Sequence, residues 1–104
     1  MKLFVSQPMR GKTKEEIAIR RQEIISEFKS KITESNTSVL YIIDSIIVDK
    51  PPETSDERVW YLGKSIELLS DADFAVFDHN WQDYSGCKIE HAICEAYDIC
   101  HLDL

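Results

Sequence analysis

Long apolar runs, a surplus of positive charge and an abundance of glycine or proline are all missing from this 104-residue sequence. Three glycines and three prolines, with 43% hydrophobic and 30% charged residues, indicate one globular domain and not a low-complexity chain. No apolar segment approaches the ~20 residues that span a bilayer, and no signal peptide precedes the strand-like start at residues 2–6. We therefore expect a cytoplasmic protein with no membrane partner.

The scarcity of basic residues limits the choice of partners. Twelve lysines and arginines stand against 19 acidic residues, which gives a formal net charge of −7. A protein that binds a nucleic acid polymer needs a basic surface to neutralise phosphates, so we expect no such partner. One nucleotide, held by one or two local cations, remains compatible with this charge.

The cysteine pattern does not indicate disulfides. Cys87, Cys94 and Cys100 are an odd number, and a cytoplasmic chain keeps its thiols reduced. Cys87, His91 and Cys94 would share one face of a helix, at positions i, i+4 and i+7. No paired-cysteine motif elsewhere completes the four ligands of a zinc site, so we predict no metal and favour a surface or subunit contact for this face. Nothing in the sequence indicates a cofactor.

Segments of strand length and helix length alternate along the chain. Thr13 followed by Glu16 has the spacing of a capping box and begins the first predicted helix. The apolar run 39–43 is typical of a strand buried on both faces. The predicted strands are 2–6, 39–43 and 73–77, with 101–104 as a candidate for a short fourth, and the predicted helices are 13–33, 57–70 and 85–98.

Apolar spacing predicts which face of each helix turns inward. Each stripe follows steps of three or four residues. The expected inward residues are Ile17, Ile24, Ile25, Phe28 and Ile32 in the first helix, Val59, Leu62, Ile66 and Leu69 in the second, and Ile89, Ala92, Ile93, Ala96 and Tyr97 in the third.

The order β-α-β-α-β-α-β predicts an α/β fold. We expect a small doubly wound parallel sheet of about four strands, Rossmann-like or flavodoxin-like, with helices on both faces. No linker or repeat interrupts residues 1–104, so we predict a single domain. Ligands of such sheets bind beyond the carboxyl ends of the strands, which here are the loops 6–12, 44–56 and 78–86.

Glu90 is the strongest candidate for a catalytic residue. It follows the buried run 74–77, a polar loop and the Ser85-Gly86 pair that begins the third helix. Unpaired N–H groups at a helix N-terminus bind anions, and glycine lets a ligand approach the backbone. The alternative is that Glu90 only balances the helix dipole and Ser85 only caps the helix.

Two more side chains could contact a ligand. Arg10, next to Gly11 in the first loop, could hold a phosphate with two parallel hydrogen bonds, although a lone surface arginine is the more common case. Trp81 could stack on a base or ribose. Trp60 and Tyr61 more often belong to a core or a subunit contact.

Three stretches of sequence carry a family resemblance. The opening residues 6–11 (SQPMRG), the middle segment 60–70 (WYLGKSIELLS) and the late segment 86–91 (GCKIEH) resemble the nucleoside 2-deoxyribosyltransferase-like superfamily. That superfamily includes deoxynucleoside-monophosphate N-glycosidases, and the similarity is closest to a short branch of phage and bacterial proteins. It covers nearly the whole chain and implies processing of a nucleoside or nucleotide N-glycosidic bond.

The resemblance also implies roles for single residues. Glu90 matches the nucleophile that attacks the anomeric carbon, and Arg10 matches an arginine that binds the 5′-phosphate. Ser65 stands where the active enzymes have an aspartate near the leaving base, and Phe4 stands where they have a tyrosine that orients the nucleophile. Catalytic roles are thus expected for Glu90 and Ser65, and substrate binding for Ser6, Gln7, Met9, Arg10, Gly11, Asp78, Trp81, Asp83, Ser85 and Gly86.

Two classes of function follow from these expectations. The first is an enzyme, either a deoxyribosyltransferase or an N-glycosidase, that forms a glycosyl intermediate on Glu90. The second is a catalytically weak protein that senses or sequesters a nucleotide, which the replacements at Ser65 and Phe4 favour. The small core and the superfamily's shared pockets lead us to expect a homo-oligomer.

Overall fold

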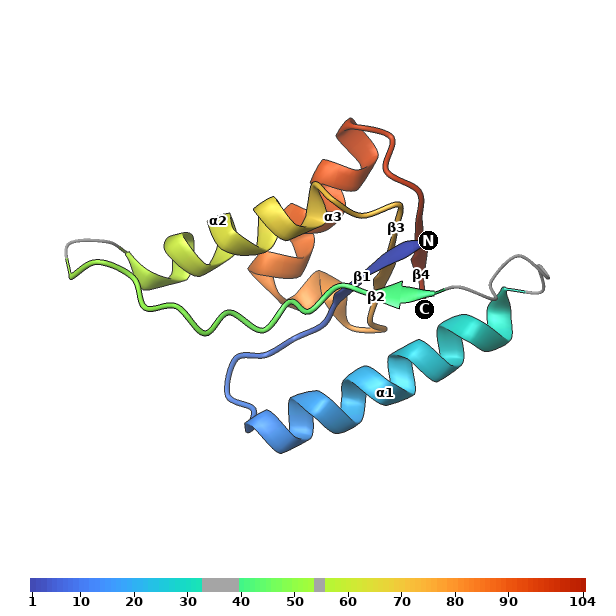
Figure 1. Cartoon of the computed structure of the whole chain (residues 1–104), viewed down its shortest axis with the longest axis horizontal. Helices are drawn as coiled ribbons and strands as arrows, with labels where there is room; N and C mark the ends of the chain where they lie inside the picture. The colour runs from blue at the N-terminus through green and yellow to red at the C-terminus, as the bar shows by residue number, and fades with distance from the viewer. Residues whose placement is uncertain (33–39, 54–55) are drawn as a thin grey trace.

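The computed structural model describes residues 1–32, 40–53 and 56–104 and has the α/β architecture that the sequence predicts. Four parallel strands form one sheet in the order β2-β1-β3-β4. Figure 1 shows α1 on one side of these strands and α2 and α3 on the other. The elements are β1 (Lys2–Ser6), α1 (Lys14–Lys31), β2 (Tyr41–Ile42), α2 (Glu57–Leu69), β3 (Phe74–Phe77), the short 3₁₀ helix η2 (Trp81–Asp83), α3 (Ser85–Ala96) and β4 (His101–Asp103).

The chain connections leave β1 in opposite directions along the sheet, and this reversal determines where a ligand could bind. From β1 the chain passes to β2 on one side, and then crosses to β3 on the other side of β1. Ser6 pairs in register with Phe77, so β1 and β3 end at the same edge of the sheet. Connections that leave in opposite directions open a crevice beyond such strand ends. The predicted doubly wound topology is confirmed.

The capping box predicted for α1 is present. The Thr13 hydroxyl accepts a hydrogen bond from the Glu16 amide at 3.1 Å, and the Glu16 carboxylate accepts one from the Thr13 amide at 3.0 Å. Two amides at the helix N-terminus are thereby satisfied. The helix ends at Lys31; the predicted end at residue 33 and the predicted start of the second strand at residue 39 lie outside the described residues.

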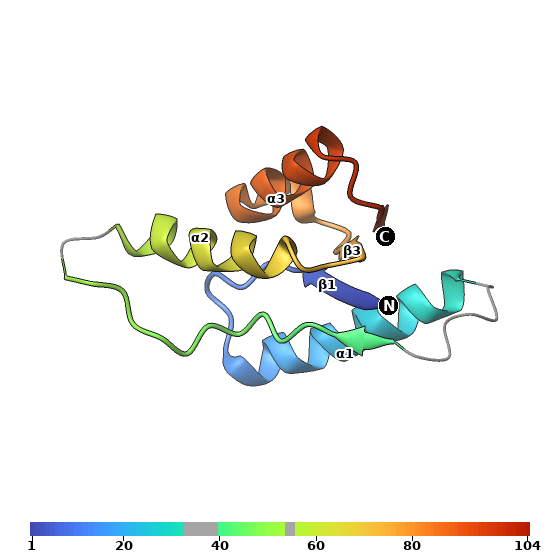
Figure 2. The ribbon, with the colours of Figure 1, turned by 45° about the horizontal axis from the view of Figure 1, so that its top comes forward.

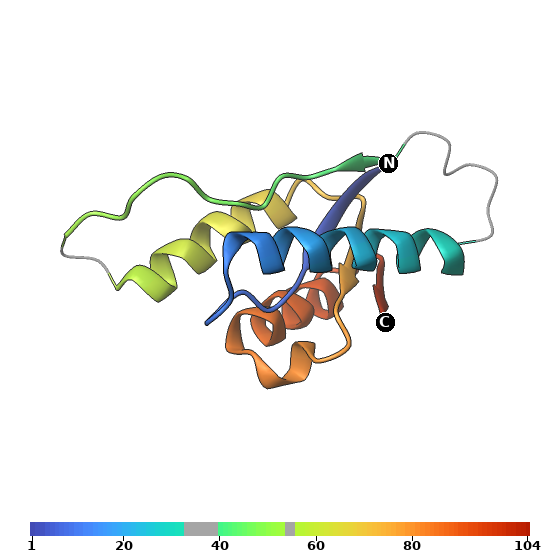
Figure 3. The ribbon, with the colours of Figure 1, turned by 90° about the horizontal axis from the view of Figure 1, so that it is seen from below.

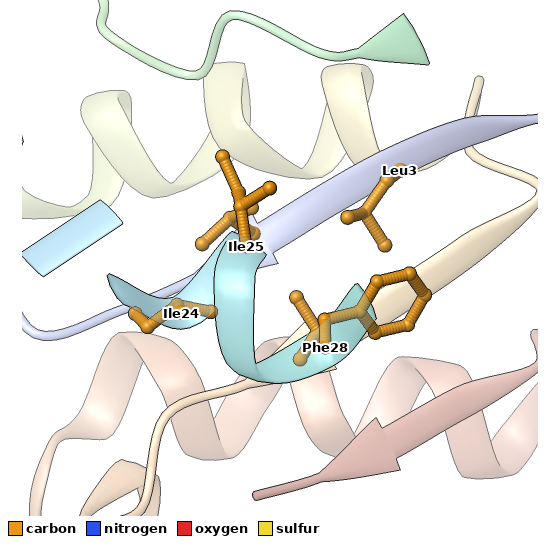
Figure 4. Close-up of a cluster of buried hydrophobic side chains, with 6 residues drawn as sticks. Leu3, Ile24, Ile25 and Phe28 are labelled. Atoms are coloured by element: carbon orange, nitrogen blue, oxygen red, sulfur yellow. The ribbon is translucent and has the colours of Figure 1, made fainter. Parts of the chain in front are cut away.

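One core cluster lies between α1 and the sheet. Ile24, Ile25 and Phe28 of the predicted stripe are buried, and they pack against Leu3, as Figure 4 shows. Figure 3, which looks onto α1 from below, shows this helix running across the strands. Each fully buried side chain of this size contributes about 1.5–3 kcal/mol relative to an exposed one. The inward face of α1 is therefore confirmed.

A second core cluster lies on the opposite face of the sheet. Its buried members include Phe4, Leu69, Phe77 and Cys94. Figure 2 shows α2 and α3 lying together above β1, where they cover this face. Successive residues of β1 point to opposite sides of the sheet, so Leu3 and Phe4 enter different clusters. The central strands β1 and β3 are largely buried on both faces, as is typical of an all-parallel sheet. The burial on both faces predicted for the run 39–43 is wrong at Tyr41, which is 65% exposed in the edge strand β2.

The predicted inward face of α3 is wrong except at Ile93, which is partly buried and packs against the second core cluster. Ile89 is 42% exposed and Tyr97 is 77% exposed, and the buried residues are Cys87, Glu90, His91 and Cys94. The helix is rotated so that Glu90 and His91 turn inward, and each of these two side chains has hydrogen-bond partners there. The surface or subunit contact proposed for the Cys87, His91 and Cys94 face is therefore wrong as well.

Helix α2 follows its prediction in length but only partly in orientation. Asp56 caps it, accepting hydrogen bonds from the amides of Arg58 and Val59. Leu69 is fully buried, whereas Val59, predicted to face inward, is 65% exposed. None of the described helices is both long and apolar enough to cross a membrane.

Candidate functional site

A cavity of about 670 Å³ lies beyond the carboxyl ends of β1 and β2. Its size suits a ligand of a few hundred daltons, since small-molecule pockets typically measure about 300–1,000 Å³. Five segments line it: residues 4–10, the first turns of α1 at residues 14 and 17, residues 45–47, one face of α2 between 58 and 65, and residues 84–90 at the start of α3. The cavity thus occupies the position that the doubly wound topology predicts for a ligand.

Glu90 lines this cavity and is held by two serine hydroxyls. Ser6 donates a hydrogen bond to Oε1 at 2.7 Å, and Ser65 donates one to Oε2 at 2.5 Å. Only 6% of Glu90 is exposed. Burial raises the pKa of Glu90 above its ordinary value, and the hydrogen bonds from Ser65 and Ser6 oppose that rise. The two hydrogen bonds therefore fix the orientation of the carboxylate, but they only partly offset the free-energy cost of removing its charge from water.

Three separate elements bring these groups together. Ser6 is the last residue of β1, Ser65 lies in α2, and Glu90 lies in the second turn of α3. Phe4, which has no hydroxyl, is buried and also lines the cavity. Ser6 supplies an oriented hydroxyl to the carboxylate from the same strand. Ser6 was expected to contact a substrate, and its hydrogen bond to Glu90 was not anticipated.

Cations predominate among the charged residues that line the cavity. They are Arg10, Lys14 and Arg58, and Glu90 is the one carboxylate among the lining residues that the structure describes. Arg58 pairs with Asp56 at 3.1 Å on the surface. Arg10 and Lys14 make no ion pair within the described part of the chain. In a chain with net charge −7, these cations give the cavity a local positive charge that would favour an anionic ligand.

The first turn of α3 adds backbone donors to the same wall. Ser85 and Gly86 line the cavity, and the N-cap residue Tyr84 makes no side-chain capping hydrogen bond. The first amides of a helix without a side-chain cap can bind an anion. A Cβ added at Gly86 would meet only Leu62, at 4.0 Å, so internal packing does not require glycine there.

Most of the predicted binding residues surround this cavity, and four do not. Trp81 stacks on His91 with ring centroids 3.7 Å apart, and Asp78 pairs with Arg20 at 2.6 Å. Gly11 occupies a turn with φ +77°, and Asp83 is exposed in η2. All four lie outside the cavity lining. The predicted residues that the structure brings to the cavity are Glu90, Ser65, Ser6, Gln7, Met9, Arg10, Ser85 and Gly86.

Several lining residues were not anticipated. Lys14 and Arg58 stand in the first turns of helices, where nothing in the sequence separates them from solvated surface charges. The rim also includes apolar side chains that are partly exposed, among them Ile46, Val59 and Ile89. These residues lie in a loop and two helices that the sequence predicts, but only the tertiary structure brings their side chains to the same cavity.

Cys87 also lines the cavity, one turn before Glu90. Burial raises the pKa of its thiol to about 11, so the neutral form predominates near neutral pH. A thiol must ionise to act as a strong nucleophile. Glu90 is consequently the better candidate for nucleophilic chemistry in this cavity.

Comparison of the chain with protein-family models, with curated proteins and with solved structures finds no match.

Proposed function

We propose that the protein binds a nucleotide in this cavity and cleaves its N-glycosidic bond, with Glu90 as the nucleophile. The observation that carries the proposal is the buried Glu90 carboxylate, oriented by two hydroxyls and open to a cavity with a cationic mouth. A fixed carboxylate beside an anomeric carbon stabilises an oxocarbenium-like transition state and can trap the sugar covalently. The resemblance to the 2-deoxyribosyltransferase-like superfamily favours the same chemistry.

The reaction would proceed in two displacements. Glu90 Oε attacks C1′ of the sugar, the bond between C1′ and the base nitrogen breaks, and the base leaves with the electron pair and takes a proton from solvent. Water, or a second base, then attacks C1′ and releases Glu90 as a carboxylate. Arg10, Lys14 and the α3 amides would hold the phosphate meanwhile.

A second function is supported by a different observation. Apart from Glu90, no carboxyl side chain lines the cavity among the residues that the structure describes, so no acid stands ready to protonate the leaving base. Loss of a general acid typically lowers a rate 10²–10⁴-fold. The alternative is a protein that binds a nucleotide and turns it over slowly or not at all.

One experiment separates the two functions. The purified chain is incubated with a panel of nucleosides and nucleoside mono-, di- and triphosphates, and free base is measured by chromatography alongside the thermal shift. Base release that disappears in Glu90→Gln supports the enzyme, and a mass increase equal to the sugar phosphate on Glu90 would identify the intermediate. A thermal shift without base release supports the binding protein. If the panel produces neither effect, both proposals fail.

A further inference from the structure

We propose that His91, His101 and Asp103 bind one divalent transition-metal ion of the zinc class, at a site separate from the cavity. One ligand atom from each of these residues lies within 4.8 Å of the other two. Two imidazole nitrogens and a carboxylate oxygen are donors that Zn²⁺ accepts, and water can fill a fourth position. None of the three residues lines the cavity that contains Glu90.

The fold brings these three donors together. His101 and Asp103 alternate along β4 and so share one face of the strand. His91 belongs to the buried face of α3, and its Nε2 lies 3.0 Å from each carboxylate oxygen of Asp103. Donors bound to one zinc ion at ~2.0–2.1 Å are roughly 3.3–3.4 Å apart in tetrahedral geometry. His91 and Asp103 are close to that spacing, and the three ligand atoms, that of His101 included, lie within 4.8 Å of one another.

Both histidines are oriented by their other ring nitrogen. His91 Nδ1 lies 3.1 Å from Oε1 of Glu95, and His101 Nδ1 lies 3.0 Å from the carbonyl oxygen of Ile99. Ligating histidines usually anchor the second nitrogen on a carboxylate or a backbone carbonyl in this way, which fixes the tautomer and leaves Nε2 for the metal. The same arrangement occurs twice here.

Aromatic packing immobilises the central ligand. Trp81 stacks on the His91 ring at 3.7 Å with an interplanar angle of 7°, and Phe77 contacts the same ring edge-on at 4.7 Å. A preorganised ligand loses little freedom when it binds a metal. Asp103 is exposed, which gives an ion and a water ligand a path to the site. A bound ion would join β4 to α3, the helix that carries Glu90.

A metal-free explanation exists for part of this cluster. A protonated His91 could form ion pairs with Asp103 and Glu95 at the same distances. That explanation gives His101 no part, because the hydrogen bond of its ring goes to the carbonyl of Ile99. The dependence of metal binding on His101 therefore separates the two explanations.

The test uses the full chain after chelator treatment, titrated with Zn²⁺ by calorimetry and with Co²⁺ by visible absorption. We expect one equivalent of either ion to bind at micromolar concentration or below, with a rise in melting temperature. His101→Ala and Asp103→Asn should each weaken Zn²⁺ binding at least 10²-fold, and Glu95→Gln, which removes an orienting partner, about 10–100-fold. Circular dichroism checks that each variant is folded.

Two variants serve as controls. His79→Ala removes another histidine that is paired with a carboxylate, Glu27 at 3.0 Å, and should leave metal binding unchanged. Cys100→Ser removes the exposed thiol beside His101 and should also leave it unchanged. The proposal is overturned if neither ion binds one-to-one, if His101→Ala binds as the parent does, or if His79→Ala or Cys100→Ser abolishes binding.

Discussion

Ser65 of α2 donates a 2.5 Å hydrogen bond to Oε2 of Glu90 in α3, and this contact joins two helices in the lining of the cavity. A catalytic role was expected for Ser65 from the sequence. A serine hydroxyl is too weak an acid to protonate a leaving base, and in the structure it donates its hydrogen bond to the carboxylate. Ser65 is thus a positioning residue for Glu90, in partnership with Ser6.

Removing either hydroxyl should make the proposed base release more sensitive to acid. A hydrogen bond to a charged group is worth about 1.5–3 kcal/mol, so loss of one favours the protonated carboxyl. In Ser65→Ala and Ser6→Ala the pKa of Glu90 should rise further, and base release at the acid end of the pH profile should fall roughly tenfold or more. Ser30→Ala, which removes an exposed hydroxyl bonded to the Glu27 carbonyl, is the control and should keep the parent profile. An unshifted acid limb in both cavity variants would contradict the positioning role.

Glu90→Gln should stabilise the protein at neutral pH. Burial raises the pKa of Glu90 in the folded state above its ordinary value, so the fold disfavours the ionised form. This penalty is absent below the ordinary pKa and develops as the pH rises through the folded-state pKa. The difference in free energy of unfolding between Glu90→Gln and the parent, measured with urea from pH 4 to pH 8, should therefore grow with pH. A difference that is constant across this range would mean that burial does not raise the pKa of Glu90 in the folded state.

Arg10 should discriminate between phosphorylated and unphosphorylated ligands. Arg10→Ala is expected to weaken nucleoside monophosphate binding about tenfold or more, because a charge-assisted bidentate contact is lost, while nucleoside binding changes little. Lys12→Ala is the matched control: this cation belongs to the same loop but lies outside the cavity lining. Calorimetry with both ligands measures the effect. Equal losses of nucleoside monophosphate affinity in the two variants would indicate a general effect of charge and not a direct contact between Arg10 and the phosphate.

Arg20→Ala should destabilise the fold through Asp78. Burial acts to raise the pKa of Asp78, but the hydrogen bonds from Arg20 and from the His79 amide outweigh it and lower that pKa below its ordinary value. The paired carboxylate therefore stabilises the fold above its ordinary pKa, and this contribution disappears as the pH falls through the folded-state pKa. We expect a loss of about 2 kcal/mol at neutral pH, less than for a fully buried pair because Arg20 is partly exposed.

Urea unfolding measures this loss, which should shrink on acidification. Arg58→Ala is the control, since its pair with Asp56 lies on the surface and should contribute nothing measurable. Equal stability of Arg20→Ala and Arg58→Ala would mean that the pair between Arg20 and Asp78 contributes no more to stability than a surface ion pair.

One cysteine of three should react readily with a thiol reagent. Cys100 is exposed, whereas Cys87 and Cys94 are buried and burial raises the pKa of each to about 11. Native protein should therefore show one rapidly labelled thiol, and urea-unfolded protein should show three. Cys100→Ser should lose the rapid phase, as mass spectrometry can verify. Rapid labelling of a second thiol in the native protein would contradict the inward rotation of α3.

Local patterns were sufficient to predict the elements and their order. The capping box at Thr13, the stripe of Ile24, Ile25 and Phe28, and the alternation of strands and helices depend on neighbours within one or two turns. Chain connectivity then restricts the topology to a doubly wound parallel sheet, and the position of Glu90 after β3 places it near a strand end. For these features the sequence alone was enough, because each is decided by short-range geometry and by general rules of chain crossover.

The tertiary structure decided which side chains meet. Ser6 and Glu90 are 84 residues apart, so their hydrogen bond depends on the strand order and on the rotation of α3, neither of which helical periodicity specifies. The apolar residues of α3 predicted the wrong inward face. The buried face contains Cys87 and Cys94, and Glu90 and His91 can be buried beside them because both have hydrogen-bond partners. In the same way, the sequence was compatible with Trp81 stacking on a ligand, whereas in the folded structure its ring stacks on His91.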